Sequence, residues 1–170
     1  MWCSDRRTLL AATLAATLAA LLALAGCGFT PAFGPDGPAV QLQNAIQVQS
    51  PTEKNGFDLV ERLEQRLGRS RTPTLTLGYQ IKTATNGVGI TPDNAITRFN
   101  VTGAVNFVLA DIETGAELTK GTVESFTSYS ASGTTVSTLA AERDAGTRLM
   151  RLLADQIVAR LVATSDAWAK

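Results

Sequence analysis

Apolar and polar residues alternate along four stretches of the chain, which is the period of a β-strand with one buried face. The stretches are residues 39–49, 74–83, 96–110 and 118–130. In the middle two, the apolar side is formed by Leu75, Leu77, Tyr79, Ile81, Phe99, Val101, Val105, Phe107 and Leu109. The pattern therefore predicts four strands, the first of them interrupted at Asn44.

Two other stretches repeat apolar residues every three or four positions, as a helix with one buried stripe does. In the first, Val60, Leu63 and Leu67 share a face, and Gly68 is expected to end the helix. Asn55 or Asp58 is expected to cap its start, because each is followed three residues later by an acidic residue.

A longer helix is predicted from about residue 137 to 163. Its stripe consists of Leu149, Leu153, Ile157 and Leu161, with Leu152 widening it. Ser137 or Thr138 is expected as the N-cap, and the small residues Ala140, Ala141, Ala145 and Gly146 as a surface for close packing. Trp168 lies beyond the stripe and is expected to dock as part of the tail.

The turns complete the order of elements. A loop is expected from Asn86 to Asn94, and a hairpin turn at 111–115, where Gly115 supplies a positive φ. The order β-α-β-β-β-α predicts an α+β fold, a two-layer sandwich in which two helices cover one face of a four-stranded mixed sheet. The other face is rich in threonine, asparagine and glutamine, and it is either a solvated surface or one that docks onto a polar, hydrated partner.

Composition narrows the function classes. The 170 residues carry 15 basic and 15 acidic side chains and no histidine. A neutral chain is a poor match for a nucleic-acid binder, and no Ser-His-Asp triad can be built. The two cysteines, Cys3 and Cys27, both precede the predicted fold, so neither a disulfide framework nor a cysteine zinc site is expected in it. We expect no metal, no cofactor and no enzymatic activity.

A periplasmic enzyme is nevertheless one alternative. Asp58, Glu61 and Glu64 could supply carboxylates, although one exposed side of a short helix is usually only solvated. Residues 125–132 hold several hydroxyl groups but no histidine to activate one.

The N-terminal segment bears on location. An uncharged stretch, residues 8–25, follows Arg6 and Arg7, which is the layout of a membrane anchor or of an export signal. It ends in Leu24-Ala25-Gly26-Cys27, which resembles the bacterial lipobox.

The lipobox resemblance implies cleavage before Cys27 and a covalent lipid on that residue, namely a diacylglyceryl group on sulfur and an N-acyl chain such as palmitate. Residues 1–26 would then be a signal peptide, 27–38 a lipidated tether and 39–170 a single domain. Gly28 in place of aspartate favours sorting to the outer membrane. The arginine pair leaves Sec and twin-arginine export both open.

Short segments along the whole predicted mature chain resemble one family. They are CGFTP with FG after it, ITRFNVTG, DIETGAEL, SFTSYSAS, AAERDAG and LADQIVARL. They are similar to the LptE family of lipopolysaccharide-assembly lipoproteins in its alphaproteobacterial form. The resemblance implies a plug inside the LptD β-barrel of the outer membrane, facing the periplasm and the barrel lumen. Such a plug assists barrel assembly and binds lipopolysaccharide in transit.

Candidate contacts to the barrel or to lipopolysaccharide lie on the polar side of the strands: Lys82, Arg98, Asn100, Thr102, Asn106 and Lys120. Few of them are basic, so long-range attraction of lipid phosphates is expected to be modest. The second alternative function is an auxiliary lipoprotein of another envelope lipid-transport complex of the ABC type.

Overall fold

The computed structural model describes residues 10, 34, 37–131 and 133–168. The chain divides into two compact units, Met1–Pro31 and Ala32–Lys170, and all the elements below belong to the second. In chain order they are α2 (Pro38–Leu42), β1 (Ile46–Val48), α3 (Lys54–Leu67), β2 (Leu75–Ile90), β3 (Ile96–Asp111), β4 (Glu117–Ser130), α4 (Thr135–Thr164) and the short 3-10 helix η1 (Ser165–Ala167). Among the helices that the structure describes, none combines the length and apolar character needed to cross a bilayer.

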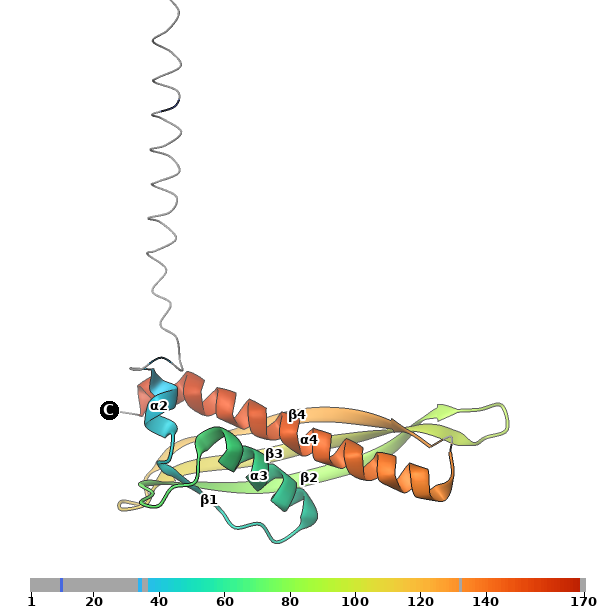
Figure 1. Ribbon diagram of the computed structural model, residues 1–170, viewed down its shortest axis with the longest axis horizontal. Helices are drawn as coiled ribbons and strands as arrows, with labels where there is room; N and C mark the ends of the chain where they lie inside the picture. Colours follow the sequence, from blue (N-terminus) through green and yellow to red (C-terminus); the bar gives the residue numbers. More distant parts are fainter. Residues whose placement is uncertain (1–9, 11–33, 35–36, 132, 169–170) are drawn as a thin grey trace, which may run out of the picture. The chain divides into compact units, whose positions relative to one another are not determined.

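The four strands form one sheet in the order β1-β2-β3-β4. β1 runs parallel to β2, whereas β2, β3 and β4 pair in antiparallel fashion. Helices α3 and α4 both lie over one face of this sheet (Figure 1). The predicted α+β sandwich, with its mixed sheet and its element order, is confirmed.

The core lies between the helices and the sheet. It takes the predicted apolar sides of the strands, including Leu77, Val105 and Leu109, and the predicted stripe of α4. Leu149, Leu153, Ile157 and Leu161 are all fully buried, but Leu152 is 45 % exposed and does not widen the stripe. Trp168 packs against the core, as expected of a docked tail.

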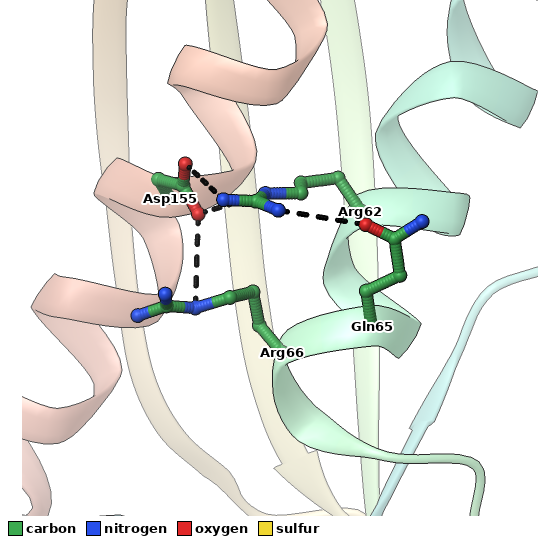
Figure 2. Close-up of polar contacts among 4 residues, drawn as sticks. All are labelled: Arg62, Gln65, Arg66 and Asp155. Carbon is green, nitrogen blue, oxygen red and sulfur yellow. Dashed lines mark hydrogen bonds and ion pairs between the residues drawn. The ribbon is translucent and has the colours of Figure 1, made fainter.

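A polar contact joins the two helices over the core. Arg62 of α3 donates from Nε and Nη2 to the two carboxylate oxygens of Asp155 of α4, at 3.0 and 2.9 Å (Figure 2). Arg66 Nε lies 3.7 Å from the same carboxylate, and Gln65 accepts from Arg62 at 3.5 Å. The hydrogen bond to Asp155 raises the pKa of Arg62. The paired geometry fixes the angle of both helices as well as their separation.

The first predicted strand is wrong over residues 39–42, which belong to α2. Pro38 stands at the start of this helix, where its fixed φ is already helical. Asn44 then takes a left-handed conformation with φ of 58°, and its N–H donates to the carbonyl of Leu67 at 2.7 Å. The interruption at Asn44 is therefore the turn that ties β1 to the end of α3, and only Ile46–Val48 remains a strand.

Both helix starts also differ from the prediction. α3 begins at Lys54 and its N-cap, Glu53, makes no side-chain cap. The predicted caps Asn55 and Asp58 lie inside the helix, where the carboxylate of Asp58 bonds to Lys54 and Thr147. α4 begins at Thr135, and Thr134 caps it by accepting from the N–H of Ser137 at 3.3 Å.

The expected loop from Asn86 to Asn94 is shorter than predicted, because β2 and β3 keep pairing to Ile90 and Ile96 with register shifts near Gly89. The ends of these strands project beyond both helices (Figure 1). Gly68 ends α3 as predicted, with φ of 79°, and Gly115 has the expected positive φ, 70°.

Candidate functional site

The candidate site is the face of β2, β3 and β4 opposite the helices, which we call the open face. Side chains alternate across a strand, so directly paired residues share a face. Because Val105 and Leu109 point to the core, the even-numbered residues of β3 make up the open face, together with their partners on β2 and β4. All six predicted contact residues belong to it.

The centre of the open face is a shallow hollow of about 520 Å³. Its floor is formed by Ala84 and Ala104, whose side chains are too short to fill the space. Around them stand Lys82, Glu124 and Phe126, brought together by the cross-strand pairs of Ala104 with Lys82 and with Glu124. The hollow thus offers one positive, one negative and one aromatic side chain around a small apolar floor.

Hydrogen bonds between neighbouring strands hold the polar residues beside the hollow. Thr122 donates to the amide oxygen of Asn106 at 2.7 Å, and Ser128 donates to that of Asn100 at 2.7 Å. Thr102 donates its hydroxyl to the carbonyl of Ala84 at 3.2 Å. Three predicted contact residues are therefore fixed in position by the face itself.

The basic residues of the open face stand apart. Lys120 forms an ion pair with Glu117 at 2.8 Å, and this hydrogen bond raises the pKa of Lys120. Arg98 lies near the other end of β3, in a separate hollow of about 310 Å³ that Asp144 and Arg148 also line. Only Lys82 and Thr102 of the predicted six line the central hollow. The face carries scattered positive charges next to acidic ones, which is no strong attractor for phosphate.

Sequence reasoning missed Glu124, Phe126 and the two floor alanines. Phe126 is 63 % exposed and stands on the polar side of β4, between the buried positions Val123 and Thr127. An aromatic residue in the polar phase of an alternating strand was the signal available in the sequence. The alanines gave no such signal, because only the pairing of separate strands places them together.

The proposed lipidation site, Cys27, and the lipobox residues Leu24, Ala25 and Gly26 lie outside the described residues, so the signal peptide and tether stay predictions. The carboxylates weighed for an enzyme are placed on α3. Asp58 pairs with Lys54 and Glu64 with Arg69, in two separate ion pairs. Within the described part of the chain, no group of three potential metal ligands comes together.

A polar face that no described helix covers, on a β-α-β-β-β-α sandwich, can now be compared with known proteins. The sequence model of the LptE family, described as lipopolysaccharide-assembly, matches residues 43–161. The chain belongs to the LptE family. No curated protein sequence matches it. The family match covers the sheet, both long helices and the whole open face, and it favours lipopolysaccharide assembly over the alternative of an ABC-type transport complex.

Solved structures of lipoproteins share this LptE fold. One, from Caulobacter crescentus CB15 and provisionally described as a lipoprotein, has 18 % identity and a TM-score of 0.64, covering 75 % of this chain and 96 % of that one. Rare lipoprotein B from Shewanella oneidensis has 13 % identity and a TM-score of 0.56, covering 72 % and 95 %. A minor lipoprotein from Acinetobacter baumannii has 14 % identity and a TM-score of 0.53, covering 70 % and 89 %. At these identities the likeness establishes the fold alone.

Proposed function

We propose that this LptE-family chain is an outer-membrane lipoprotein that assists assembly of the LptD β-barrel, occupies its lumen and takes part in lipopolysaccharide transport to the cell surface. The observation that carries the proposal is the open face, which is polar, ordered by its own hydrogen bonds and left uncovered by every described helix.

The chemistry of the open face suits a hydrated pore. The interior of a large outer-membrane barrel is polar and wet. Hydroxyl and amide groups such as those of Thr102 and Asn106 exchange water for partner hydrogen bonds at less desolvation cost than charged groups. The central hollow adds an aromatic anchor, Phe126, of the kind that contributes most at protein interfaces. Contacts to the barrel would then outweigh contacts to lipid phosphates.

The membrane attachment rests on Cys27. One acyl chain gives only reversible binding, whereas two or more chains give stable anchoring. In the proposal, the lipidated thiol holds the chain at the outer membrane, and residues 28–36 connect it to α2.

The central experiment is recovery of the lipidated chain from its own envelope in mild detergent, followed by measurement of the LptD barrel that accompanies it. We expect Ala104→Arg, which fills the hollow with a charged side chain, to lower barrel recovery by about tenfold, equivalent to about 1.4 kcal/mol. Gln156→Arg is the matched control, because it places the same side chain on the exposed side of α4. Equal barrel recovery with both variants, or no barrel with the wild-type chain, contradicts the plug role.

The anchor is tested separately by Cys27→Ala. We expect the variant to remain an unprocessed precursor or to lose its place in the outer-membrane fraction, as seen by fractionation and intact mass. A Cys27→Ala chain that is still processed and still found in the outer membrane rules out the lipid anchor. This result leaves the barrel experiment unaffected.

A further inference from the structure

The two outer edges of the sheet differ in how they are protected. An exposed strand edge presents unpaired N–H and C=O groups to which another chain can pair, and native proteins guard such edges with charged side chains. On β4 the carbonyl of Ser128 accepts from Arg148 of α4 at 3.4 Å. The side chain of Arg148 therefore guards the β4 edge at Ser128.

The outer edge of β2 has no paired strand over part of its length. β1 pairs only with Leu75–Leu77, and the side chain of Gln49 then accepts from the N–H of Tyr79 at 3.3 Å. From Ile81 to Thr85, no described strand pairs with this edge. We call this segment the β2 edge.

The phase of β2 shows which backbone groups the β2 edge exposes. Leu75 donates its N–H to Ala45 at 3.1 Å, and Leu77 accepts from Gln49 at 2.9 Å. Odd-numbered residues thus direct their backbone groups away from β3. By the same alternation, Ile81, Thr83 and Thr85 direct theirs outward, before the register shifts that begin at Gly87.

Two hollows run along the helix side of the β2 edge. One, of about 360 Å³, is lined mostly by polar residues, among them Gln49, Thr52, Glu53 and Lys82, together with Tyr79 and Ile81. The next, of about 290 Å³, lies between Thr83 and Thr85 of β2, Lys54 of α3 and the first turns of α4. Val101, Leu149 and Met150 form its buried floor, and Gly146 faces open space there, since a Cβ on it would meet nothing within 4 Å. Together the hollows would receive alternate side chains of a strand added to β2.

We infer that the β2 edge binds an extended segment of another polypeptide as an added strand, with an apolar side chain entering the second hollow and an acidic side chain opposite Lys82. Main-chain hydrogen bonds give such strand addition its affinity, and pockets for alternate side chains give it specificity. Lys82 stands on the open side of the edge, away from the charged residues Lys54, Glu142 and Arg143 that line the second hollow, so a carboxylate directly opposite it is favoured. The inference concerns a different surface from the open face and stands whether or not the barrel proposal holds.

Other occupants fit less well. An acyl chain has no donors or acceptors for the backbone groups of Ile81, Thr83 and Thr85. A second copy of this chain, pairing edge to edge, would direct threonine hydroxyls onto the apolar floor formed by Leu149 and Met150. An extended peptide pairs with these backbone groups and can also place an aliphatic side chain on the apolar floor of the second hollow.

The test uses the full chain in mild detergent and a synthetic peptide, acetyl-Thr-Val-Asp-Val-Thr-Val-Thr-amide. Hydrogen exchange of the segment 79–87 is followed by mass spectrometry. At a peptide concentration ten times Kd, exchange of the edge amides is expected to slow by about tenfold. Two further peptides are compared, one methylated at the valine amide nitrogens and one at the other amide nitrogens. Only one of them is expected to lose the slowing of exchange, because alternate amides of an added strand face β2.

Protein variants locate the peptide. Gly146→Leu fills the second hollow while favouring the helix, so it is expected to weaken peptide binding at least about tenfold without loss of stability. Ala140→Leu is the matched control, on an exposed position of the same helix.

Three outcomes overturn the inference. The first is no slowing of exchange by the unmethylated peptide up to about 1 mM, the weak end of specific affinities. The second is an equal loss of binding for the two methylated peptides, or an equal loss for the variants Gly146→Leu and Ala140→Leu. The third is slowing that depends on protein concentration without peptide, which would assign the β2 edge to a second copy of this chain.

Discussion

The two faces of the sheet are built from the same strands, but one is buried beneath the helices and the other is exposed. On β3, Val105, Phe107 and Leu109 are 0, 2 and 0 % exposed beneath the helices. Asn106 and Val108, which alternate with them, lie on the open face and are exposed. A step of one residue along the strand therefore separates positions that hold the fold together from positions available to a partner.

Two adjacent residues on β4 break this pattern in opposite directions. Thr127 is a polar residue on the covered face, and it donates its hydroxyl to the carbonyl of Ala145 on α4 at 2.9 Å. Ala145 is the position where the predicted small-residue surface does bring helix and sheet close, whereas Gly146 next to it faces a hollow. Phe126 is an apolar residue on the open face. The hydrogen-bonded threonine stabilises the fold, whereas the exposed phenylalanine belongs to the face that we propose meets the barrel.

The largest effect is expected from truncating the covered face. Leu153→Ala removes a fully buried side chain from the stripe of α4 and should lower the free energy of unfolding by about 2–5 kcal/mol. Leu152→Ala, at the neighbouring 45 % exposed position, should cost less than about 1 kcal/mol. Urea unfolding of both variants measures the difference. Similar losses of unfolding free energy for the two variants would contradict a core that lies between α4 and the covered face of the sheet.

A smaller effect is expected from adding volume to each face at neighbouring positions of β3. A Cβ on Gly103 would lie 3.0 Å from Leu149 Cδ2 and 3.1 Å from Leu153 Cδ1, so Gly103→Val should cost about 1–3 kcal/mol. Ala104→Val enters the hollow of the open face and should change stability by no more than about 0.5 kcal/mol. Thermal or urea unfolding measures the free energy of unfolding of both variants. A loss for Ala104→Val as large as that for Gly103→Val would show that the open face is packed rather than accessible to a partner.

The smallest effect concerns the turn that sets the register of β3 and β4, and hence which residues reach each face. Asp111 accepts from the N–H of Thr114 at 2.8 Å and from its hydroxyl at 2.9 Å, and these bonds lower the pKa of Asp111 below 3.8. A lowered pKa adds stability that is present above the unfolded-state value and is lost as pH falls through the folded-state value.

Asp111→Asn should therefore be less stable than the wild-type chain at pH 6, and the gap should narrow as the pH falls below about 4. Unfolding midpoints across this range measure the gap, with Glu113→Gln as the control that removes one carboxylate from the same turn. A gap that stays constant with pH, or one equal to that of the control, would remove Asp111 from the set of residues that fix the register.

The alternating pattern was sufficient to place the strands and the fold class, because burial of one face forces a period of two. The pattern failed where a short segment fits the period of a strand and that of a helix equally well. Val40 and Leu42 fit a strand as well as a single helical turn, and Pro38 decided for the helix. Leu152 lies next to the apolar stripe of α4 in sequence. Which side of that stripe is covered depends on where α3 packs, and the sequence pattern of α4 alone does not contain this information.

The candidate site was predictable only in part. The polar phase of β3 placed Asn100, Thr102 and Asn106 on one face, as found. The hollow itself depends on Ala84, Ala104 and Phe126 from three strands, and their proximity follows from cross-strand register rather than from any local motif. The same holds for the β2 edge, which lacks a paired strand because β1 ends after Val48.

The position of α2 in the domain limits how far each part of the domain could lie from the bilayer. Figure 1 shows α2 at the end of the sheet away from the projecting turn between β2 and β3. A lipidated Cys27 would be joined to Gly37 by the nine residues 28–36, which span at most about 36 Å when fully stretched. In that arrangement α2 would stay within about this distance of the bilayer, and the turn between β2 and β3 could reach farther from it.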